Sequence, residues 1–587
     1  MALSALVERL VQLARSRSAP PPAAAPDNLL EEAVAAAASG AGGRARVICE
    51  DLLTRFPRYA AGHHLLGVLQ AQNGDSQGAL AHLVEAAALA PEWPDAHLAL
   101  GNVRQLLQDA AGAEASYRRT LALDPAAAGA HYNLALLLRR AGRGDEALQA
   151  LRRAHELAPE RGDMTWDLVQ ALLTAGVPDE ARAAAERTLA LAGESADAHK
   201  SLGLVHLNLH EAAQALERFH RAAALAPADT EAWLHAGLAA RELARLDDAL
   251  TAYERVLSIA PDHAQARWHR SLVRLLKGEF DRAWTDYEAR TLSETWPRRG
   301  FPQPRWRGEP LAGKTLLVHS EQGLGDEIMF ASCLPEVIAQ ARHCVIDCHP
   351  RLAPIFERSF PSATVHGGHQ TDDPAWLARH PAPDYQIPIG SLPLFLRARP
   401  GDFSRHAGYL AAHPAKVASW RARLAGLGPG LKVGLSWQGG TQLSRSRLRS
   451  LTLEQLLPVL RVEGARFVDL QYTETARERA HLESEHGVRL THWPDAIADY
   501  DETAALASAV DLVVTVCTAL VHLTGALGRP AWVMTPYSPE WRYGQAGDGM
   551  LWYPSVKLLR QPRYGEWEPV IATVARDLRL AAGARSG

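Results

Sequence analysis

The hydrophobic positions in the first half of the chain follow a helical spacing, and the whole pattern repeats every 34 residues. Alanine occupies one register at residues 45, 79, 113, 147, 181, 215, 249 and 283, and proline occupies another at residues 57, 91, 125, 159, 227 and 261. A period of this length predicts pairs of antiparallel helices, with a small residue where the helices cross and a proline where the second helix ends. We therefore expect an α-solenoid of about eight repeats over residues 26–290.

Glycines at residues 67, 101, 203 and 237 mark a second close-packing position. With the alanines and prolines they resemble the tetratricopeptide repeat, which implies a superhelix whose concave face binds a protein or extended peptide. The alternative is an array that only supports or oligomerises the rest of the chain. In protein O-GlcNAc transferases, which also carry such repeats, an asparagine two places before the packing glycine grips peptide. Of the seven equivalent positions only Asn133 matches, so the sequence does not favour that mode of binding.

Beyond residue 313 the pattern changes to short apolar runs that alternate with helical stretches. The expected strands are residues 315–320, 344–348, 385–389, 432–437, 466–471, 488–492, 511–516 and 531–535. Such alternation predicts an α/β fold of two doubly wound halves, 314–412 and 413–587, that face each other across a cleft. Residues 291–313, rich in proline and tryptophan, suit an ordered strap that caps the last repeat. Residues 1–25 form a leader with the apolar spacing of an amphipathic helix.

Composition narrows the possible partners. A formal net charge of -4, from 62 basic and 66 acidic residues, gives no electrostatic case for nucleic acid or an anionic membrane. No uncharged run approaches the roughly 18 to 20 residues of a membrane span. Five cysteines, few and odd in number, fit a reducing compartment, so we expect a cytoplasmic protein.

The segment TLLVHSEQGLGDEIMF, residues 315–330, is the first candidate for chemistry. An apolar strand ends in a glycine-rich turn, and the turn places Asp326 at the start of a helix. One interpretation is that Asp326 is a helix N-cap, and the other is that it is a general base. The segment lacks the third glycine of a dinucleotide-binding fingerprint.

The second half contains a matching turn in DLVVTVCTALVHLTGALGRPAWVMTP, residues 511–536. Thr518 and Ala519 fall at the start of a helix, where free N–H groups favour a phosphate, and His522 lies one turn further on. The run WQGGTQLSRSRLRS, residues 437–450, adds arginines for bidentate phosphate contacts at positions 445, 447 and 449. A solvated arginine-rich loop is the alternative, and it suits Arg449 least because a helix start follows.

These motifs, together with VGLSWQGG, FVDLQY and LWYPSVKLLRQ, resemble the heptosyltransferase family of glycosyltransferases (family nine) over nearly all of residues 270–575. The resemblance implies a GT-B fold and inverting transfer of a sugar from a nucleotide-diphosphate donor to an acceptor hydroxyl, with no metal and no cofactor besides that donor. It implies that Asp326 deprotonates the acceptor. The residues it places at the donor are Gly325, Arg449, Thr518, Ala519, His522, Trp541 and Arg542.

One position departs from the sequence motif of the family. The usual Val-Asp-Thr before the helix is here Val516-Cys517-Thr518, so a carboxylate that would touch the donor is absent. Only an ionised Cys517 would replace its charge, as a helix start permits. This departure keeps two alternatives open, an inactive adaptor that retains the fold and a nucleotide-sugar sensor without turnover. A zinc site from His343, Cys344, Cys348 and His349 is disfavoured, because in a strand the cysteines and histidines face opposite sides.

Overall fold

The structure is a computed structural model of the chain, and it describes residues 26–293, 296, 299–370, 373–403, 406–440 and 448–586. The predicted leader, residues 1–25, and the predicted phosphate-binding Arg445 and Arg447 lie outside the described residues. The chain divides into two compact units, Met1–His235 and Ala236–Gly587.

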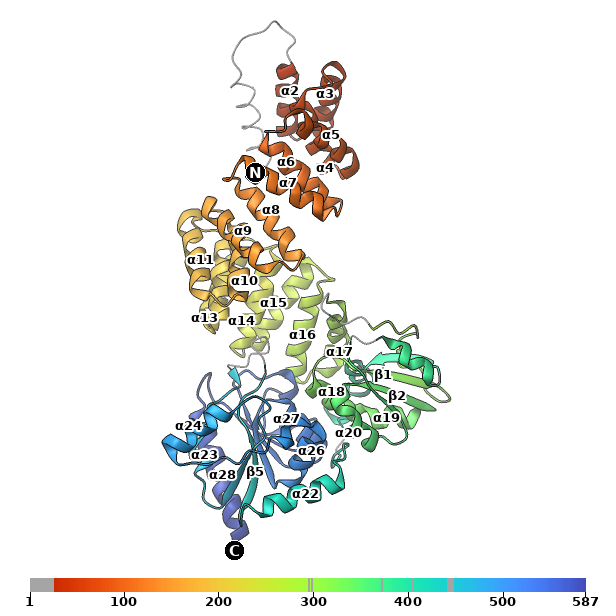
Figure 1. Cartoon of the computed structure of the whole chain (residues 1–587), viewed down its shortest axis with the longest axis vertical. Coiled ribbons are helices and arrows are strands. Elements are labelled where there is room, and N and C mark those ends of the chain that lie inside the picture. The colour runs from red at the N-terminus through yellow and green to blue at the C-terminus, as the bar shows by residue number, and fades with distance from the viewer. Residues whose placement is uncertain are drawn as a thin grey trace. The chain divides into compact units, whose positions relative to one another are not determined.

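The first unit consists of antiparallel helix pairs (Figure 1). Its helices are α2 (Pro26–Ala38), α3 (Gly42–Arg55), α4 (Ala60–Gln72), α5 (Ser76–Leu89), α6 (Pro94–Leu106), α7 (Ala110–Leu123), α8 (Ala128–Arg140), α9 (Gly144–Leu157), α10 (Gly162–Thr174), α11 (Pro178–Ala192), α12 (Ala196–Asn208), α13 (Ala212–Leu225) and the beginning of α14 (Thr230–Glu242). Each pair has the length that the 34-residue period predicts.

The two small-residue registers lie where the helices of a pair cross. The side chains of Ala79, Ala113 and Ala215 have no exposed surface. A Cβ atom added at Gly67 would lie 2.7 Å from Leu83, and one added at Gly101 would lie 2.6 Å from the Tyr117 ring. The glycines are therefore required by close helix packing, which confirms the predicted repeat architecture.

The second unit begins with the end of α14 and continues through the last repeats into an α/β region. Its first helices are α15 (Leu246–Ile259), α16 (Ala264–Lys277), α17 (Phe280–Tyr287) and the 3-10 helix η1 (Glu288–Leu292). In the described part of the strap that follows, the Arg290 guanidinium lies over the ring of Trp296. The strap then runs along the edge strand β4, where the Trp306 backbone N–H donates to the Gln386 carbonyl at 2.9 Å. The strap therefore protects a strand edge.

The first sheet has four parallel strands in the order β3-β2-β1-β4. The strands are β1 (Thr315–His319), β2 (His343–Cys348), β3 (Thr364–Gly367) and β4 (Tyr385–Pro388), and the helices between and after them are α18 (Leu324–Phe330), α19 (Leu334–Gln340), α20 (Ala353–Ser359) and α21 (Pro393–Leu396). Every residue of β1 is buried, as expected for a parallel strand that is covered on both faces.

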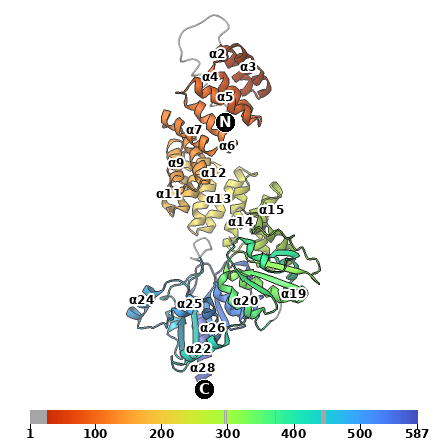
Figure 2. The same ribbon diagram turned by 45° about the vertical axis from the view of Figure 1, so that its right-hand side comes forward.

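The second sheet has six strands in the order β6-β5-β7-β8-β10-β9, and only β9 is antiparallel to its neighbour. Figure 2 shows this region, with its helices, in the blue colours of the C-terminal part of the chain. The strands are β5 (Leu431–Ser436), β6 (Ala465–Asp469), β7 (Leu512–Val516), β8 (Ala531–Thr535), β9 (Gly549–Met550) and β10 (Tyr553–Arg560). The helices are α22 (Pro414–Ala425), α23 (Leu457–Leu460), α24 (Ala476–His486), α25 (Asp495–Ala498), α26 (Tyr500–Ala509), α27 (Ala519–Ala526) and α28 (Glu568–Ser586).

The predicted strand at residues 488–492 is wrong, because this segment makes only an isolated bridge between Val468 and Thr491. Its alternation of apolar and polar residues is real, but the segment meets the sheet at a single point. Three strands, β3, β9 and β10, were not predicted, and β9 has only two residues. Strand β3 is short and only half-buried, and β10 contains Pro554 near its start, so neither has a strong strand pattern.

Both sheets reverse their winding direction at a defined pair of strands. In the first sheet the chain proceeds from β1 outward to β3 and then returns to place β4 on the other side of β1. In the second sheet it proceeds from β5 to β6 and returns to place β7 on the other side of β5. Ligands of open α/β sheets bind beyond the carboxyl ends of such strands, so the loops after β1, β4, β5 and β7 are the places to examine.

Candidate functional site

The turn after β1 carries Asp326, and the structure excludes the N-cap interpretation of this residue. Gly323 is the N-cap of α18, and no side chain caps the helix. The Asp326 carboxylate instead pairs with the guanidinium of Arg542, in the 3-10 helix η9 (Trp541–Tyr543) that follows β8. The predicted base of the first sheet and a predicted donor-binding residue of the second sheet are therefore in direct contact.

Arg542 is a partly buried cation with capacity for a further ligand. Burial alone would lower the pKa of Arg542, but the charges of Asp326 and Glu540 offset it and hold the pKa above its ordinary value. Within the described part of the chain, the Arg542 Nε atom is buried without a hydrogen-bond partner. A buried, charged donor of this kind is costly unless something accepts from it, which favours an anionic ligand.

The turn after β7 starts α27 as the sequence predicted. Thr518 is the N-cap, and its hydroxyl accepts from the Leu520 N–H at 3.2 Å. Ala519 is the first helical residue. His522 lies one turn on, fully enclosed, with its Nδ1 atom 3.2 Å from the Tyr553 hydroxyl. Burial, with the charges of Arg542 and Arg449, lowers the pKa of His522 well below its ordinary value, so the ring is neutral at pH 7.

Gly325 brings the two helix starts together. A Cβ atom added at Gly325 would lie 3.2 Å from the Ala519 Cα atom and 3.1 Å from the His522 ring. The first turn of α18 therefore packs directly on the first turn of α27, and even a methyl group at Gly325 would have to displace its neighbours. This close approach places Asp326 and the N–H groups of α27 in one region.

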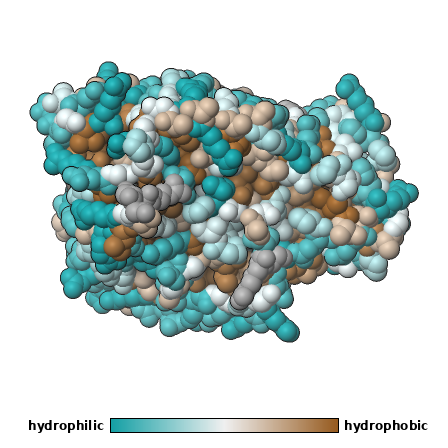
Figure 3. Space-filling view, turned by 90° about the horizontal axis from the view of Figure 1, so that it is seen from below, coloured by the Kyte–Doolittle hydropathy of each residue, from teal (hydrophilic) through white to brown (hydrophobic). Residues whose placement is uncertain are grey.

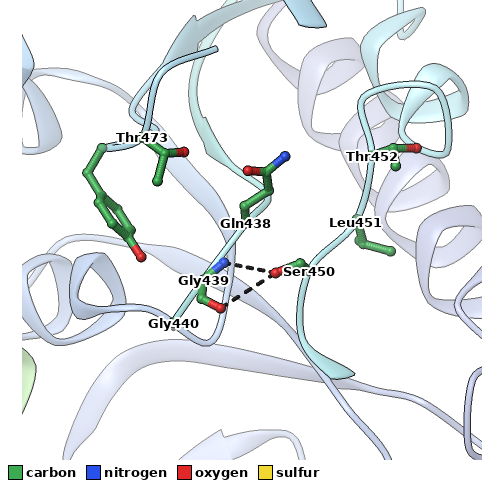
Figure 4. A pocket seen from close by; sticks show the side chains of 8 residues that line it. Gln438, Gly439, Gly440, Ser450, Leu451, Thr452 and Thr473 are labelled. Atoms are coloured by element: carbon green, nitrogen blue, oxygen red, sulfur yellow. Dashed lines mark hydrogen bonds between the residues drawn. The ribbon is translucent and has the colours of Figure 1, made fainter. Parts of the chain in front are cut away.

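A cavity of about 450 Å³ opens beyond the carboxyl ends of β5 and β6 (Figure 4). It is lined by Gln438, Gly439, Gly440, Ser450, Leu451, Thr452, Tyr472 and Thr473. The Gly439 N–H donates to the Ser450 hydroxyl at 3.1 Å, and a Cβ atom at Gly439 would lie 2.7 Å from Thr518. The cavity thus adjoins the N-cap of α27. Arg449 precedes Ser450, and its Nε atom is buried without a partner in the described residues.

Cys517 is a neutral thiol in this environment. Burial raises its pKa to about 12, more than the neighbouring Arg449 lowers it. The helix start therefore does not ionise Cys517, and the thiol does not replace the carboxylate of the usual Val-Asp-Thr motif. Its neighbours Tyr543 and Arg542 would surround an aspartate at the same place.

Trp541 is buried in an aromatic cluster. Its ring centroid lies 5.7 Å from Trp284, 5.9 Å from Tyr287, 6.3 Å from Phe330 and 6.1 Å from Trp552. The structure thus brings together Asp326, Gly325, Ala519, His522 and Arg542. Trp541, in contrast, makes its ring contacts with other aromatic side chains of the protein.

Glu327 is a residue of this region that the sequence reasoning missed. Its side chain is buried beside Asp326, and its carboxylate accepts from the His349 N–H at 2.9 Å. Burial raises the pKa of Glu327 to about 8. The only signal in the sequence was the consecutive acid pair Asp326-Glu327 in the first turn of a helix, whose two side chains must point in different directions.

The four candidate zinc residues do not form a metal site in the described part of the chain. Cys344 and Cys348 are buried in the sheet, and the His343 Nε2 atom lies 2.9 Å from the Thr364 hydroxyl. Among the described residues, no three His, Cys, Asp or Glu side chains are arranged to hold a metal ion. None of the described helices has the length and apolar character needed to cross a membrane. The face of the molecule in Figure 3 has apolar residues interspersed among hydrophilic ones.

Comparison with known proteins identifies the repeats. Family models of the tetratricopeptide repeat match residues 98–161, 138–204, 202–262 and 234–298. The chain is 39% identical over 298 residues to Protein FlbA of Caulobacter vibrioides, which is 48% of this chain and 49% of FlbA. The similarity thus spans about half the length of this curated relative.

Solved structures resemble the chain only loosely. The Cut9-Hcn1 hetero-tetramer of the APC/C matches with 20% identity and a TM-score of 0.36, over 45% of this chain and 52% of that one. Yeast Tom70 matches with 15% identity and a TM-score of 0.34, over 50% and 68%. The family matches and the helix geometry together establish tetratricopeptide repeats in the N-terminal part of the chain.

Proposed function

We propose that the chain is an inverting glycosyltransferase of GT-B type that moves a sugar from a nucleotide-diphosphate donor to an acceptor hydroxyl without a metal ion. The observation that carries the proposal is the position of Asp326. Its carboxylate follows β1 at the switch point of the first sheet and meets Arg542 and the start of α27 from the second sheet. The family resemblance of residues 270–575 supports the same assignment.

In this proposal Asp326 accepts the proton of the acceptor hydroxyl as that oxygen attacks the anomeric carbon. The departing diphosphate is stabilised by the N–H groups at the start of α27 and by Arg449 and Arg542. Arg542 would then exchange its contact with Asp326 for a phosphate oxygen, which leaves Asp326 free to accept the proton. The cavity beside Gly439 and Ser450 adjoins this region and would hold another part of the donor.

The repeat array would recruit a protein or peptide partner to the enzyme, as tetratricopeptide repeats commonly do. A cytoplasmic location agrees with five buried cysteines, none of which forms a disulfide. The competing functions, an inactive adaptor and a nucleotide-sugar sensor, are favoured by one observation, the neutral thiol of Cys517 where the family has a carboxylate.

A ligand panel separates these functions. Nucleotides and nucleotide sugars should raise the melting temperature of an enzyme or a sensor and leave that of an adaptor unchanged. Donor hydrolysis or transfer should then occur with the stabilising donor for an enzyme and be absent for a sensor. Arg449→Ala should weaken the stabilisation, whereas Arg563→Ala, which changes an exposed arginine paired with Glu566, serves as the matched control. Stabilisation by no member of the panel would contradict the proposal.

A further inference from the structure

The last repeat helix, α17, and the adjoining η1 contact both sides of the proposed catalytic region. We propose that Tyr287 and Arg290, at the junction of α17 and η1, are positioning residues that set the Asp326 turn against Arg542, so that the last repeat is a working part of the catalytic site. This inference rests on the proposed glycosyl transfer at Asp326.

Arg290 joins the two strands at the switch point of the first sheet. Arg290 makes a bidentate contact with Glu321, in the turn after β1, through Nη2 to Oε1 at 2.8 Å and Nε to Oε2 at 3.2 Å. Its Nη2 atom also lies 2.7 Å from the hydroxyl of Ser391, after β4. Its Nη1 atom donates to the Tyr287 carbonyl at 3.1 Å. Arg290 and Glu321 are both buried, and a bidentate arginine in a dry site fixes the geometry of its acceptors more strictly than an exposed ion pair does.

Tyr287 holds the next residue of the turn in an unfavourable backbone conformation. Gln322 has φ of +61°, a left-handed conformation that costs a side-chain-bearing residue energy. The Gln322 Nε2 atom donates to the Tyr287 hydroxyl at 3.0 Å, and the Gln322 carbonyl accepts from Gln370 at 3.0 Å. Strained residues persist only where surrounding contacts enforce them, and this one lies four residues before Asp326.

The same helix also contacts the loop that carries Arg542. The rings of Trp284 and Tyr287 pack against Trp541, with centroids 5.7 and 5.9 Å apart. The Trp284 Nε1 atom donates to the Arg397 carbonyl at 2.8 Å, which fixes α17 to the first half as well. Because Trp541 directly precedes Arg542, the position of α17 sets the positions of both partners in the Asp326–Arg542 pair.

Two mild substitutions in the full-length chain test the inference. Tyr287→Phe removes the hydroxyl and keeps the ring packing, and Arg290→Lys keeps the charge and loses the bidentate contact. Tyr253→Phe is a matched control, because Tyr253 lies 34 residues earlier in the repeat register and its buried hydroxyl has no hydrogen-bond partner within the described residues. Arg358→Lys is the second control, because Arg358 pairs with Asp501.

Two readouts are needed, steady-state kinetics with the donor that the ligand panel identifies and amide hydrogen exchange of residues 320–328. Tyr287→Phe and Arg290→Lys should each lower kcat by roughly tenfold, with the donor KM within about twofold of wild type, because misplacement of a reacting group affects the transition state more than binding. Exchange in residues 320–328 should rise by roughly fivefold or more in both variants and stay unchanged in both controls.

The outcomes separate the inference from the proposed function. Wild-type protein that turns over no donor would refute the transferase, and exchange alone would then decide whether α17 and η1 hold the turn. A wild-type enzyme whose kcat and exchange are unaffected by Tyr287→Phe and Arg290→Lys overturns the inference. Equal losses in the control variants would also overturn it, because they would show general destabilisation.

Discussion

Glu327 gives a quantitative test of the electrostatics beside the candidate base. The residue is only 1% exposed, and burial raises the pKa of its carboxyl group from 4.5 to about 8. Below pH 8 the folded protein therefore retains a proton on Glu327 that the unfolded chain has released above pH 4.5. The group thus makes folding less favourable as pH rises from about 4.5 to about 8, which is the expected sign for an acid whose folded pKa is raised.

Glu327→Gln removes this penalty, because the amide resembles the protonated carboxyl and does not titrate. With 1.36 kcal/mol per pKa unit, the penalty is under about 1 kcal/mol at pH 5 and about 3 kcal/mol at pH 7. The free energy of unfolding of Glu327→Gln relative to wild type should therefore rise by about 2 to 3 kcal/mol between these pH values. The change with pH is independent of any constant difference in packing between the two side chains.

Urea unfolding of the second unit, followed by tryptophan fluorescence at pH 5, 6 and 7, measures the difference. Glu357→Gln is the control, since Glu357 is exposed in α20 of the same sheet region. Comparison with this variant separates the effect of burying a carboxyl group from the effect of removing one at the surface. A Glu327→Gln difference that is the same at all three pH values would show that Glu327 is ionised in the folded protein and would refute the reasoning.

Three further substitutions probe two close packing contacts and the donor side of the proposed site. Gly325→Val should separate α18 from α27, because its Cβ atom would lie 3.2 Å from the Ala519 Cα atom, and should lower the free energy of unfolding by about 1 to 3 kcal/mol; unchanged urea unfolding would contradict this. Gly528→Ala should cost about 3 kcal/mol or more, because Gly528 has φ of +66° and the new Cβ atom would lie 1.5 Å from the Ala407 carbonyl oxygen; a calorimetric melting temperature near that of wild type would exclude the packing described. Cys517→Asp should tighten donor binding by roughly tenfold, because a carboxylate can make charge-assisted hydrogen bonds to the donor. Weaker binding in titration calorimetry would show that the missing carboxylate does not reduce the affinity for the donor.

The repeats were predictable because their signal is local and periodic. Ala79, Ala113 and Gly101 recur at a fixed spacing, and each lies where two neighbouring helices cross. The strands β1 and β7 were predicted within a residue or two, because fully buried parallel strands have continuous apolar runs. The segment 488–492 was not distinguishable from a strand, since whether an alternating segment pairs along its length depends on tertiary placement.

For the candidate site, the sequence allowed the turns to be located but not the contacts between them. The positions of Asp326 and Thr518 followed from strand–turn–helix patterns. The structure places Asp326 in the first turn of α18, after β1, and Thr518 at the N-cap of α27, after β7. The pairing of Asp326 with Arg542, the burial of Trp541 and the contact of Arg290 with Glu321 join residues that are distant in sequence. Such contacts depend on how the sheets and α17 pack, and a single sequence contains no local signal for them.

The proposed role of Asp326 as the base of a glycosyl transfer can be measured through the release of nucleotide. Mass spectrometry should follow this release for wild type and Asp326→Asn, with the donor that stabilises the protein. We expect turnover by wild type and a loss of roughly 10² to 10⁴-fold in Asp326→Asn, with the donor still bound. Turnover by Asp326→Asn at the wild-type rate, or no turnover by wild type with any donor, would contradict this role.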